Sequence, residues 1–308
     1  MKERIKILWL PAWYPSRVDF FNGDFVHRHA IAATKFVDVI LIFVVKDELL
    51  ISSSTSIHFE EKDGIFIYTA YYNSSVKNLF LKKIIFGFLY FKLLFKLYGQ
   101  AKKAHFNFNL IHVQIASKQG LFALWLKFTK GIKYVITEHS GWFMPIGSNF
   151  FTTSIFQKAI IKLNFKYASA IHVVSNSLGV ELRKRYSFIK FFTVIPNVVD
   201  SSVFYYNNQA TNKHTLQFLA INGYSFQKNV DGVIRAFSAY LQKGYNAFLH
   251  VAGPNDDHLK ILAKNLDSKD TIKFYGVIDS SSIASLMQEA DALLFFTRFE
   301  SLDRKSVV

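Results

Sequence analysis

Two histidines, one lysine and one glutamate stand out because each lies near the end of an apolar run or in a glycine-containing loop. His112 lies in LIHVQIA, His139 directly follows YVITE, Lys228 lies in AINGYSFQKN, and Glu300 follows DALLFFTRF. Histidine moves protons, lysine offsets negative charge, and a carboxylate accepts hydrogen bonds. Each residue also has an ordinary structural explanation, because strand-end histidines are often structural and loop lysines are usually solvated. Their chemistry therefore depends on which elements bring them together.

Other kinds of chemistry leave no trace in the sequence. There is no cysteine, which excludes disulfides and thiolate metal sites and favours the cytoplasm. There is no clustered set of Asp and His ligands, so we expect no metal cofactor. No carboxylate pair suited to double displacement is evident either. The apolar stretch at the amino terminus ends at Pro11 and Pro15, too short for a signal peptide, and predicts a buried strand.

Short apolar runs alternate with longer helical patterns. Strand-like runs in the first two hundred residues are IKILWL, DVILIFVV, IFIYTAYY, LIHVQIA, KYVITEH, AIHVVS and FFTVIPN. Strands buried on both faces look this way, and intervening helices imply right-handed crossovers in a parallel sheet. The pattern restarts with LQFLAING, NAFLHVAG, TIKFYG and DALLFFT, between helices expected near 229–243, 256–266 and 280–289.

This alternation predicts an α/β protein of two Rossmann-like, doubly wound domains. We expect them at 1–200 and 215–308, joined by the polar stretch 201–214, with a ligand cleft between the carboxyl ends of their strands.

The segment 76–105 predicts a long basic amphipathic helix. Its lysines interrupt it too often for a membrane span. On a helical projection most of them, including Lys82, Lys92 and Lys96, share one half of the circumference, and aromatic and aliphatic residues fill the rest. Two explanations stay open: binding to an anionic membrane surface, or a crossover helix packed on the sheet.

Several of these patterns together resemble the retaining GT-B glycosyltransferases of family 4, from residue 1 to about 302. The motifs are WYPSRVDFFNGDFVHRHAIA, YVITEHS, ASAIHVVSNSLGVEL, VIPNVVDSSVF, AINGYSFQKNVDGVIRAF and TIKFYGVIDSSSIASLMQEADALLFFTRFES. In the most recognisable of them, Pro196, Asn197 and Asp200 are expected to shape the turn into the second domain. The resemblance implies transfer of a sugar from a nucleotide-sugar donor to a glycan or lipid-linked acceptor, with retention of configuration and without a metal.

In the first domain the resemblance implies two site residues. Gly23, with Asp24 and Phe25 opening the helix behind it, would let the backbone approach the donor diphosphate. His139 would lie beside the transferred sugar and orient the donor, as a catalytic residue, whereas His112 is expected to be structural.

In the second domain it implies a donor-binding site. Lys228, in the loop that contains Gly223, would meet the diphosphate and offset charge on the leaving group. Backbone groups near Gly276 and Val277 would hold the nucleotide base. The carboxylate of Glu300 would accept hydrogen bonds from donor-sugar hydroxyls and act in catalysis.

The sequence departs from the family pattern at two places. Tyr224 follows the glycine where many members have an arginine, so one of two usual cations is missing. The second residue of a paired-glutamate motif would fall at Val308, and the last residues, LDRKSVV, replace a glycine loop and an apolar helix. We therefore expect an incomplete carboxyl-terminal domain in a truncated chain, with low stability and weak or absent turnover.

Other functions remain as alternatives. The net charge of +15 implies a polyanionic partner, among nucleic acid, anionic lipid and nucleotide phosphates. No nucleic-acid-binding signature is present, so nucleic acid is not expected. A nucleotide-sugar epimerase of the same fold and an inactive fragment stay open. The favoured setting is polysaccharide assembly in the cytoplasm, on the inner face of the cell membrane.

Overall fold

The structure, a computed structural model, describes residues 4–50, 55–73, 76, 78–145, 153–206, 215–221, 223, 226–266, 270–298 and 300–301. The chain divides into two compact units. One comprises Met1–Phe143 and Ser148–Val198, and the other comprises Met144–Gly147 and Val199–Val308. Both are α/β units built on largely parallel sheets, as the alternation of runs predicts. The expected linker lies partly outside the described residues, so its boundaries stay a prediction.

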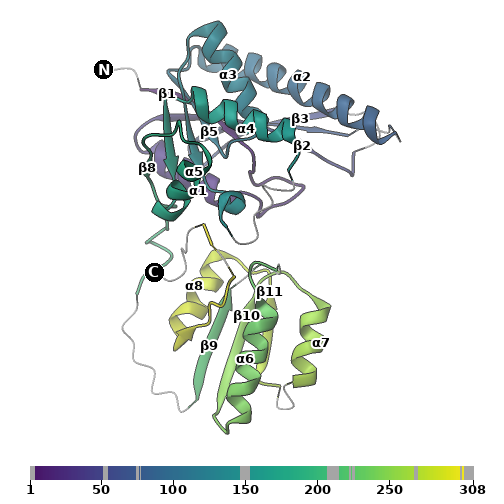
Figure 1. The fold of residues 1–308 in the computed structure, drawn as a ribbon. Coiled ribbons are helices and arrows are strands. Elements are labelled where there is room, and N and C mark those ends of the chain that lie inside the picture. The colour runs from purple at the N-terminus through teal and green to yellow at the C-terminus, as the bar shows by residue number, and fades with distance from the viewer. Residues whose placement is uncertain are drawn as a thin grey trace. The chain divides into compact units, whose positions relative to one another are not determined.

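The first unit is built on an eight-stranded sheet of order β3-β4-β2-β1-β5-β6-β7-β8 (Figure 1). Its strands are β1 (Lys6–Pro11), β2 (Asp38–Lys46), β3 (Thr55–Lys62), β4 (Ile65–Tyr72), β5 (Leu110–Gln114), β6 (Tyr134–Glu138), β7 (Ala170–Val173) and β8 (Thr193–Val194). Its helices are α1 (Asp24–Thr34), α2 (Leu79–His105), α3 (Gln119–Lys130), the 3₁₀ turn η1 (Gly141–Phe143), α4 (Ile155–Tyr167) and α5 (Asn176–Arg185).

Side chains alternate across this sheet and so serve two helical layers. In β2, Leu41 and Phe43 belong to a core cluster that also contains Val26 and Ala30 of α1. The residues between them point to the opposite face, where α2 packs on β2 and β4. A strand buried on both faces must be apolar at almost every position, which explains the continuous run in the sequence.

Strand β3 was not predicted, although its turn carries a recognisable signal. It pairs with β4 antiparallel, with Lys62 opposite Ile65. Asp63 and Gly64 connect the strands with φ values of 53° and 74°. A two-residue hairpin turn with positive φ at both positions favours an Asp-Gly dipeptide, so this pair marks the hairpin.

Helix α2 is docked on the sheet along one side and exposed along the other. Leu93, Leu94 and Leu97 are buried, whereas Phe88 is 66% exposed. Lys92 and Lys96 are also exposed, so the solvent side carries both lysines and apolar residues. By length and composition, the helix qualifies as a membrane span, although it packs as a crossover helix here.

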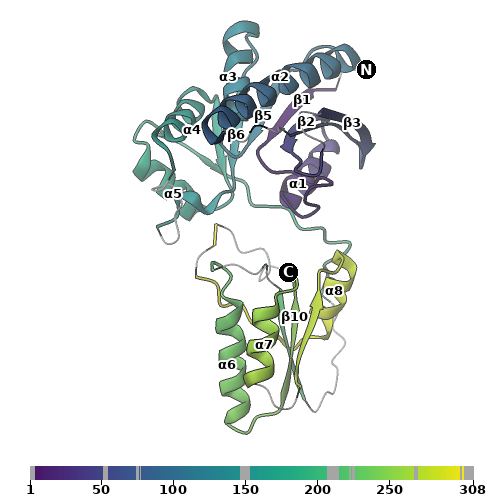
Figure 2. The ribbon, with the colours of Figure 1, turned by 90° about the vertical axis from the view of Figure 1, so that its right-hand side faces the viewer.

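The second unit has a four-stranded parallel sheet of order β11-β10-β9-β12. Its strands are β9 (Leu216–Ile221), β10 (Ala247–Ala252), β11 (Ile272–Gly276) and β12 (Ala292–Leu293), and its helices are α6 (Val230–Gln242), α7 (Asp257–Leu266) and α8 (Ser280–Glu289). Figure 2 shows α6 and α7 on one face of the sheet and α8 on the other. These helices match the three expected ranges within one residue at each end.

Candidate functional site

Each sheet has a point where the chain reverses the direction in which it adds strands. In the second unit β9 pairs with both β10 and β12, so the reversal lies between β9 and β12. In the first unit β1 pairs with both β2 and β5. Loops at such points diverge at the carboxyl ends of the strands and leave a crevice for ligands. The candidate site residues follow these strand ends.

Lys228 and Glu300 meet in the second unit although 72 residues separate them. The Nζ atom of Lys228 lies 2.5 Å from Oε1 of Glu300, and their side chains are 24% and 17% exposed. Gln227 donates from Nε2 to Oε2 of the same carboxylate at 3.4 Å. The backbone N–H of Arg298 donates to the carbonyl of Gln227 at 2.9 Å, which fastens the two loops together. The structure therefore places one cation and one carboxylate side by side at the reversal point.

The loop that carries Lys228 leads directly into α6. Asn229 precedes the helix with a φ of 52°, a left-handed conformation that asparagine tolerates. Its Nδ2 donates to the carbonyl of Phe296 at 3.0 Å. A Cβ at Gly232 would lie 2.6 Å from Nδ2 of Asn229, so only glycine fits below that side chain. Lys228 is thus presented immediately before a helix amino terminus, where the backbone favours anions.

The remaining residues expected to bind the donor lie at neighbouring strand ends. Gly223 follows β9, and no atom of the described residues lies within 4 Å of a Cβ built on it. Gly276 ends β11 with a φ of 69°, and its carbonyl accepts from the N–H of Gly253 at 2.9 Å. Val277 is 48% exposed. Tyr224 lies outside the described residues, and so do residues 302–308, on which the expected incompleteness rests.

Gly23 is packed against the main chain of the first loop. Its φ is 72°, and a Cβ would lie 2.4 Å from the carbonyl carbon and oxygen of Trp13. Behind it α1 begins at Asp24, whose carboxylate pairs with Arg28 at 2.9 Å. The contact with Trp13 already requires glycine, so the proposed approach to a diphosphate stays a prediction.

His139 follows β6 and is only 5% exposed. Its Nε2 lies 2.8 Å from Oε1 of Gln114, and its Nδ1 lies 2.9 Å from Oδ1 of Asn197. Asn197 was expected to shape the turn alone. No sequence pattern indicated that it reaches a histidine 58 residues away, because the contact arises from the positions of β6 and the segment after β8.

His112 lies within β5 and is partly buried. Its Nε2 lies 2.7 Å from the hydroxyl of Thr137, which belongs to β6. Burial lowers the pKa of His112 to about 3, and His172 and His29 add to the effect. The structural role expected of His112 from the sequence stays a prediction.

Glu138 was missed by the sequence analysis. Its fully buried carboxylate accepts from the backbone N–H groups of Ala116 at 3.0 Å, His139 at 3.1 Å and Ser140 at 2.8 Å. Burial raises the pKa of Glu138 to about 7, against the lowering effect of these donors. The signal was a charged residue inside the apolar strand YVITE. The carboxylate fastens the loop after β5 to the loop that carries His139.

The loop after β5 also contains strained backbone. Ile115 has a φ of 70°, which a β-branched residue rarely adopts. Gln119 donates to the carbonyl of Ile115 at 2.6 Å, and the N–H of Ile115 donates to Thr137 at 2.8 Å. Such a conformation costs about 1 to 3 kcal/mol and persists only where its surroundings impose it. The strain turns the chain immediately after Gln114.

The buried Glu138 and the partly buried His112 should give opposite pH dependences of stability. Because the pKa of Glu138 is raised, its contribution to the free energy of unfolding is present below about pH 4.5 and is lost as the pH rises through about 7. The lowered pKa of His112 means that its contribution is present above about pH 6.5 and is lost as the pH falls towards 3.

Denaturant unfolding at several pH values between 4.5 and 6.5 would measure both slopes. The destabilisation caused by His112→Gln should shrink as the pH falls, and that caused by Glu138→Gln should shrink as the pH rises. Each slope should approach about 1.4 kcal/mol per pH unit. A destabilisation that stays constant with pH would contradict the assigned shift.

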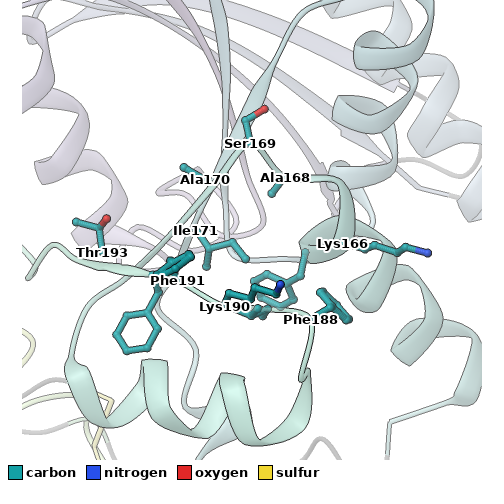
Figure 3. A pocket seen from close by; sticks show the side chains of 12 residues that line it. Lys166, Ala168, Ser169, Ala170, Ile171, Phe188, Lys190, Phe191 and Thr193 are labelled. Carbon is teal, nitrogen blue, oxygen red and sulfur yellow. The ribbon is translucent and has the colours of Figure 1, made fainter.

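A cavity of about 370 Å³ lies away from these residues. It is lined by α4, the start of β7 and the segment before β8, including Phe188, Lys190 and Phe191 (Figure 3). It therefore opens at the amino ends of these strands, whereas His139 follows the carboxyl end of β6. The strand-end loops, and not this cavity, hold the residues suited to the predicted chemistry.

Two family models match consecutive parts of the chain. Residues 56–203 match the family Glycosyltransferase Family 4, and residues 205–302 match Glycosyl transferases group 1. No curated protein sequence matches the chain.

Solved structures share the fold at low identity. Sucrose-phosphate synthase from Thermosynechococcus elongatus is similar, with a TM-score of 0.68 and 16% identity over 98% of this chain and 77% of that one. The catalytic domain of starch synthase IV from Arabidopsis thaliana, bound to ADP and acarbose, has a TM-score of 0.65 and 12% identity over 98% of this chain and 80% of that one. HepE from Anabaena, in complex with UDP and glucose, has a TM-score of 0.63 and 14% identity over 97% of this chain and 76% of that one. With two glycosyltransferase family matches in sequence order and this two-domain α/β fold, the chain is a GT-B glycosyltransferase.

Proposed function

We propose that the protein transfers a sugar from a nucleotide-sugar donor to a glycan or lipid-linked acceptor, with retention of anomeric configuration, in the synthesis of a cell-surface polysaccharide. The main support is the pair of Lys228 and Glu300 at the reversal point of the second sheet. A nucleotide-sugar donor has a diphosphate beside a hydroxylated ring, so it needs a cation and a hydrogen-bond acceptor close together. This pair offers both.

In the proposed reaction the two side chains have different roles, which follow from their opposite charges. In the structure the carboxylate of Glu300 pairs with Lys228. On donor binding, the ammonium of Lys228 would turn to the diphosphate and offset the charge that develops as it leaves. Glu300 would then accept hydrogen bonds from sugar hydroxyls. Retention would follow if the acceptor oxygen bonds to the anomeric carbon on the face that the diphosphate leaves, with no nucleophile from the protein. The bond from that carbon to the diphosphate oxygen breaks, and the proton of the acceptor hydroxyl passes to the departing diphosphate.

Structures with the same fold contain ligands of this class. Starch synthase IV holds ADP and acarbose, and HepE holds UDP and glucose. Their ligands support a nucleotide-sugar donor and a saccharide acceptor here, while the base and the sugar are left to experiment.

We further propose that transfer needs no metal. Among the described residues, no group of three or more His, Cys, Asp and Glu side chains is arranged to hold an ion. In this proposal Lys228 and the amino terminus of α6 supply the positive potential that a metal would otherwise provide.

A thermal-shift experiment tests the donor site. The protein is heated with UDP, GDP and their common sugar conjugates, with and without magnesium. A ligand at about one hundred times its Kd stabilises the folded state by about 2.7 kcal/mol, so one base should raise the Tm clearly. The rise should not depend on magnesium. Cooperative melting without a shift for any nucleotide would contradict the proposal.

The membrane setting rests on the exposed side of α2. Phe88 is 66% exposed and Phe95 is 41% exposed, beside the exposed Lys92 and Lys96. No acidic residue occurs within α2. A surface that combines cations with aromatic rings suits the interface of an anionic bilayer. We propose that the enzyme works in the cytoplasm, bound peripherally to the inner face of the membrane.

Neutralising Lys82, Lys92 and Lys96 together, each to glutamine, should weaken binding to vesicles that contain anionic lipid. At roughly 1 kcal/mol for each lysine near the surface, the loss should approach roughly 100-fold. Sedimentation with vesicles measures it. The matched control changes three exposed lysines of the second unit, Lys243, Lys264 and Lys273, and should have little effect. Equal losses in both variants would show that net charge matters and that α2 does not.

A further inference from the structure

Both ring nitrogens of His139 face side-chain amides, but the two amides differ in burial. Gln114, which faces Nε2, has an exposed fraction of 0%. Asn197, which faces Nδ1, is only partly buried. Phe25 packs on the ring at 4.7 Å between centroids, so the ring has little room to turn. The Nε2 side is therefore anchored inside the unit, and the Nδ1 side lies nearer to solvent.

The amide of Gln114 is itself oriented by a second histidine. Its Nε2 lies 3.2 Å from Nε2 of His112. Burial lowers the pKa of His112 to about 3, so the ring is neutral and one of its two nitrogens accepts. An amide Nε2 can only donate, so its contact with Nε2 of His112 makes Nε2 the accepting nitrogen, and the hydroxyl of Thr137, 2.7 Å from the same atom, is then a donor to it as well. An amide has one donating end and one accepting end. If the donating end meets His112, the accepting oxygen meets His139, and His139 carries a proton on Nε2.

Asn197 shares its oxygen between two imidazoles. Its Oδ1 lies 2.9 Å from Nδ1 of His139 and 3.0 Å from Nε2 of His29. With the proton of His139 on Nε2, its Nδ1 is an acceptor, so the Asn197 amide must turn its Nδ2 towards this ring. The amide lies two residues before Val199, where the second unit resumes. A partly exposed amide is a partner that a sugar hydroxyl can replace, whereas the buried amide of Gln114 is not.

We propose that Gln114 is a positioning residue of the transfer reaction. It anchors Nε2 of His139 and fixes the tautomer, and so leaves Nδ1 as the atom that meets a sugar hydroxyl in place of Asn197. The inference rests on the proposed glycosyl transfer. In this inference Gln114, from β5, does not contact the sugar and acts only through His139.

The test compares two replacements of Gln114 in the full chain. Gln114→Met keeps the length of the side chain but makes no hydrogen bond to His139, and Gln114→Glu still accepts one. The assay uses the nucleotide sugar that raises the Tm and follows its slow hydrolysis as release of the nucleoside diphosphate. This gives a reaction rate without an identified acceptor. Gln114→Met should lower this rate roughly 10- to 100-fold at unchanged donor Kd, and Gln114→Glu should restore most of it. The control is Gln242→Met, on the exposed end of α6.

Imidazole ¹⁵N spectra provide a readout that needs no donor, with His139→Gln identifying the signals. The native protein should show a proton on Nε2 of His139, and Gln114→Met should give a mixture of tautomers. An unchanged tautomer in Gln114→Met overturns the inference. So does a His139→Ala variant that hydrolyses the donor at the native rate, although the proposed function then stands. A chain that binds no nucleotide sugar refutes the proposed function, and the inference about catalysis falls with it.

Discussion

Replacing Lys228 by alanine should weaken donor binding by about 1.5 to 3 kcal/mol, which is the contribution of a charge-assisted hydrogen bond. The expected rise in donor Kd is therefore roughly 10- to 150-fold. The structure adds a second reason. Without the ammonium, the carboxylate of Glu300 loses its partner at 2.5 Å and repels the diphosphate. Calorimetric titration with the nucleoside diphosphate measures the loss.

The double variant Lys228→Ala with Glu300→Gln separates the two effects. If repulsion by the unpaired carboxylate contributes, the double variant should bind the free nucleoside diphosphate better than Lys228→Ala alone. Lys243→Ala, which removes an exposed lysine after α6, is the matched control and should bind normally. Native affinity in Lys228→Ala would remove this lysine from the donor site.

Replacing Gly23 by alanine should destabilise the first unit by roughly 2 to 5 kcal/mol, because it combines left-handed strain with overpacking. The φ of 72° accounts for the strain, and the 2.4 Å approach of a Cβ to the main chain of Trp13 accounts for the overpacking. Backbone cannot move aside as a side chain does, so the start of α1 must shift. Urea unfolding of the full chain measures the loss.

Gly131→Ala is the matched control for this effect. Gly131 also has a left-handed φ, of 69°, but in the part of the chain that the structure describes nothing lies within 4 Å of a Cβ built there. Its replacement should therefore cost only the strain, about 1 to 2 kcal/mol. Equal destabilisation by both variants would show that the loop around Trp13 moves to accommodate the Cβ without a loss of free energy of unfolding.

The parts of the fold that were predicted are those that a local pattern fixes. Continuous apolar runs located the strands of the parallel sheets, and helical periodicity located α6, α7 and α8. Ser154 and Ser175 show why such boundaries are local, since each caps its helix with its own side chain. Strand β3 was missed because its second half contains three consecutive charged and exposed residues, Glu60, Glu61 and Lys62, which hide the strand signal.

The site was predicted only in part, because its contacts join distant segments. Family resemblance placed Lys228 and Glu300 in one site, but their direct pairing depends on where the loop after β12 runs. The contact between His139 and Asn197 spans 58 residues and has no local signature. The main-chain donors to Glu138 are equally invisible in sequence, since backbone groups are the same for every residue type.

The two edges of the first sheet bear on how this apolar chain avoids aggregation. One edge is β3, which carries Glu60, Glu61 and Lys62, and the other is β8, which is two residues long. A strand from another molecule that approaches β3 meets charges, and one that approaches β8 finds too few backbone partners to hold it. Over half of the residues are hydrophobic, so a long uncharged edge would favour pairing between molecules during synthesis. Replacing the β3 charges would therefore affect the yield of soluble protein more than its folded stability.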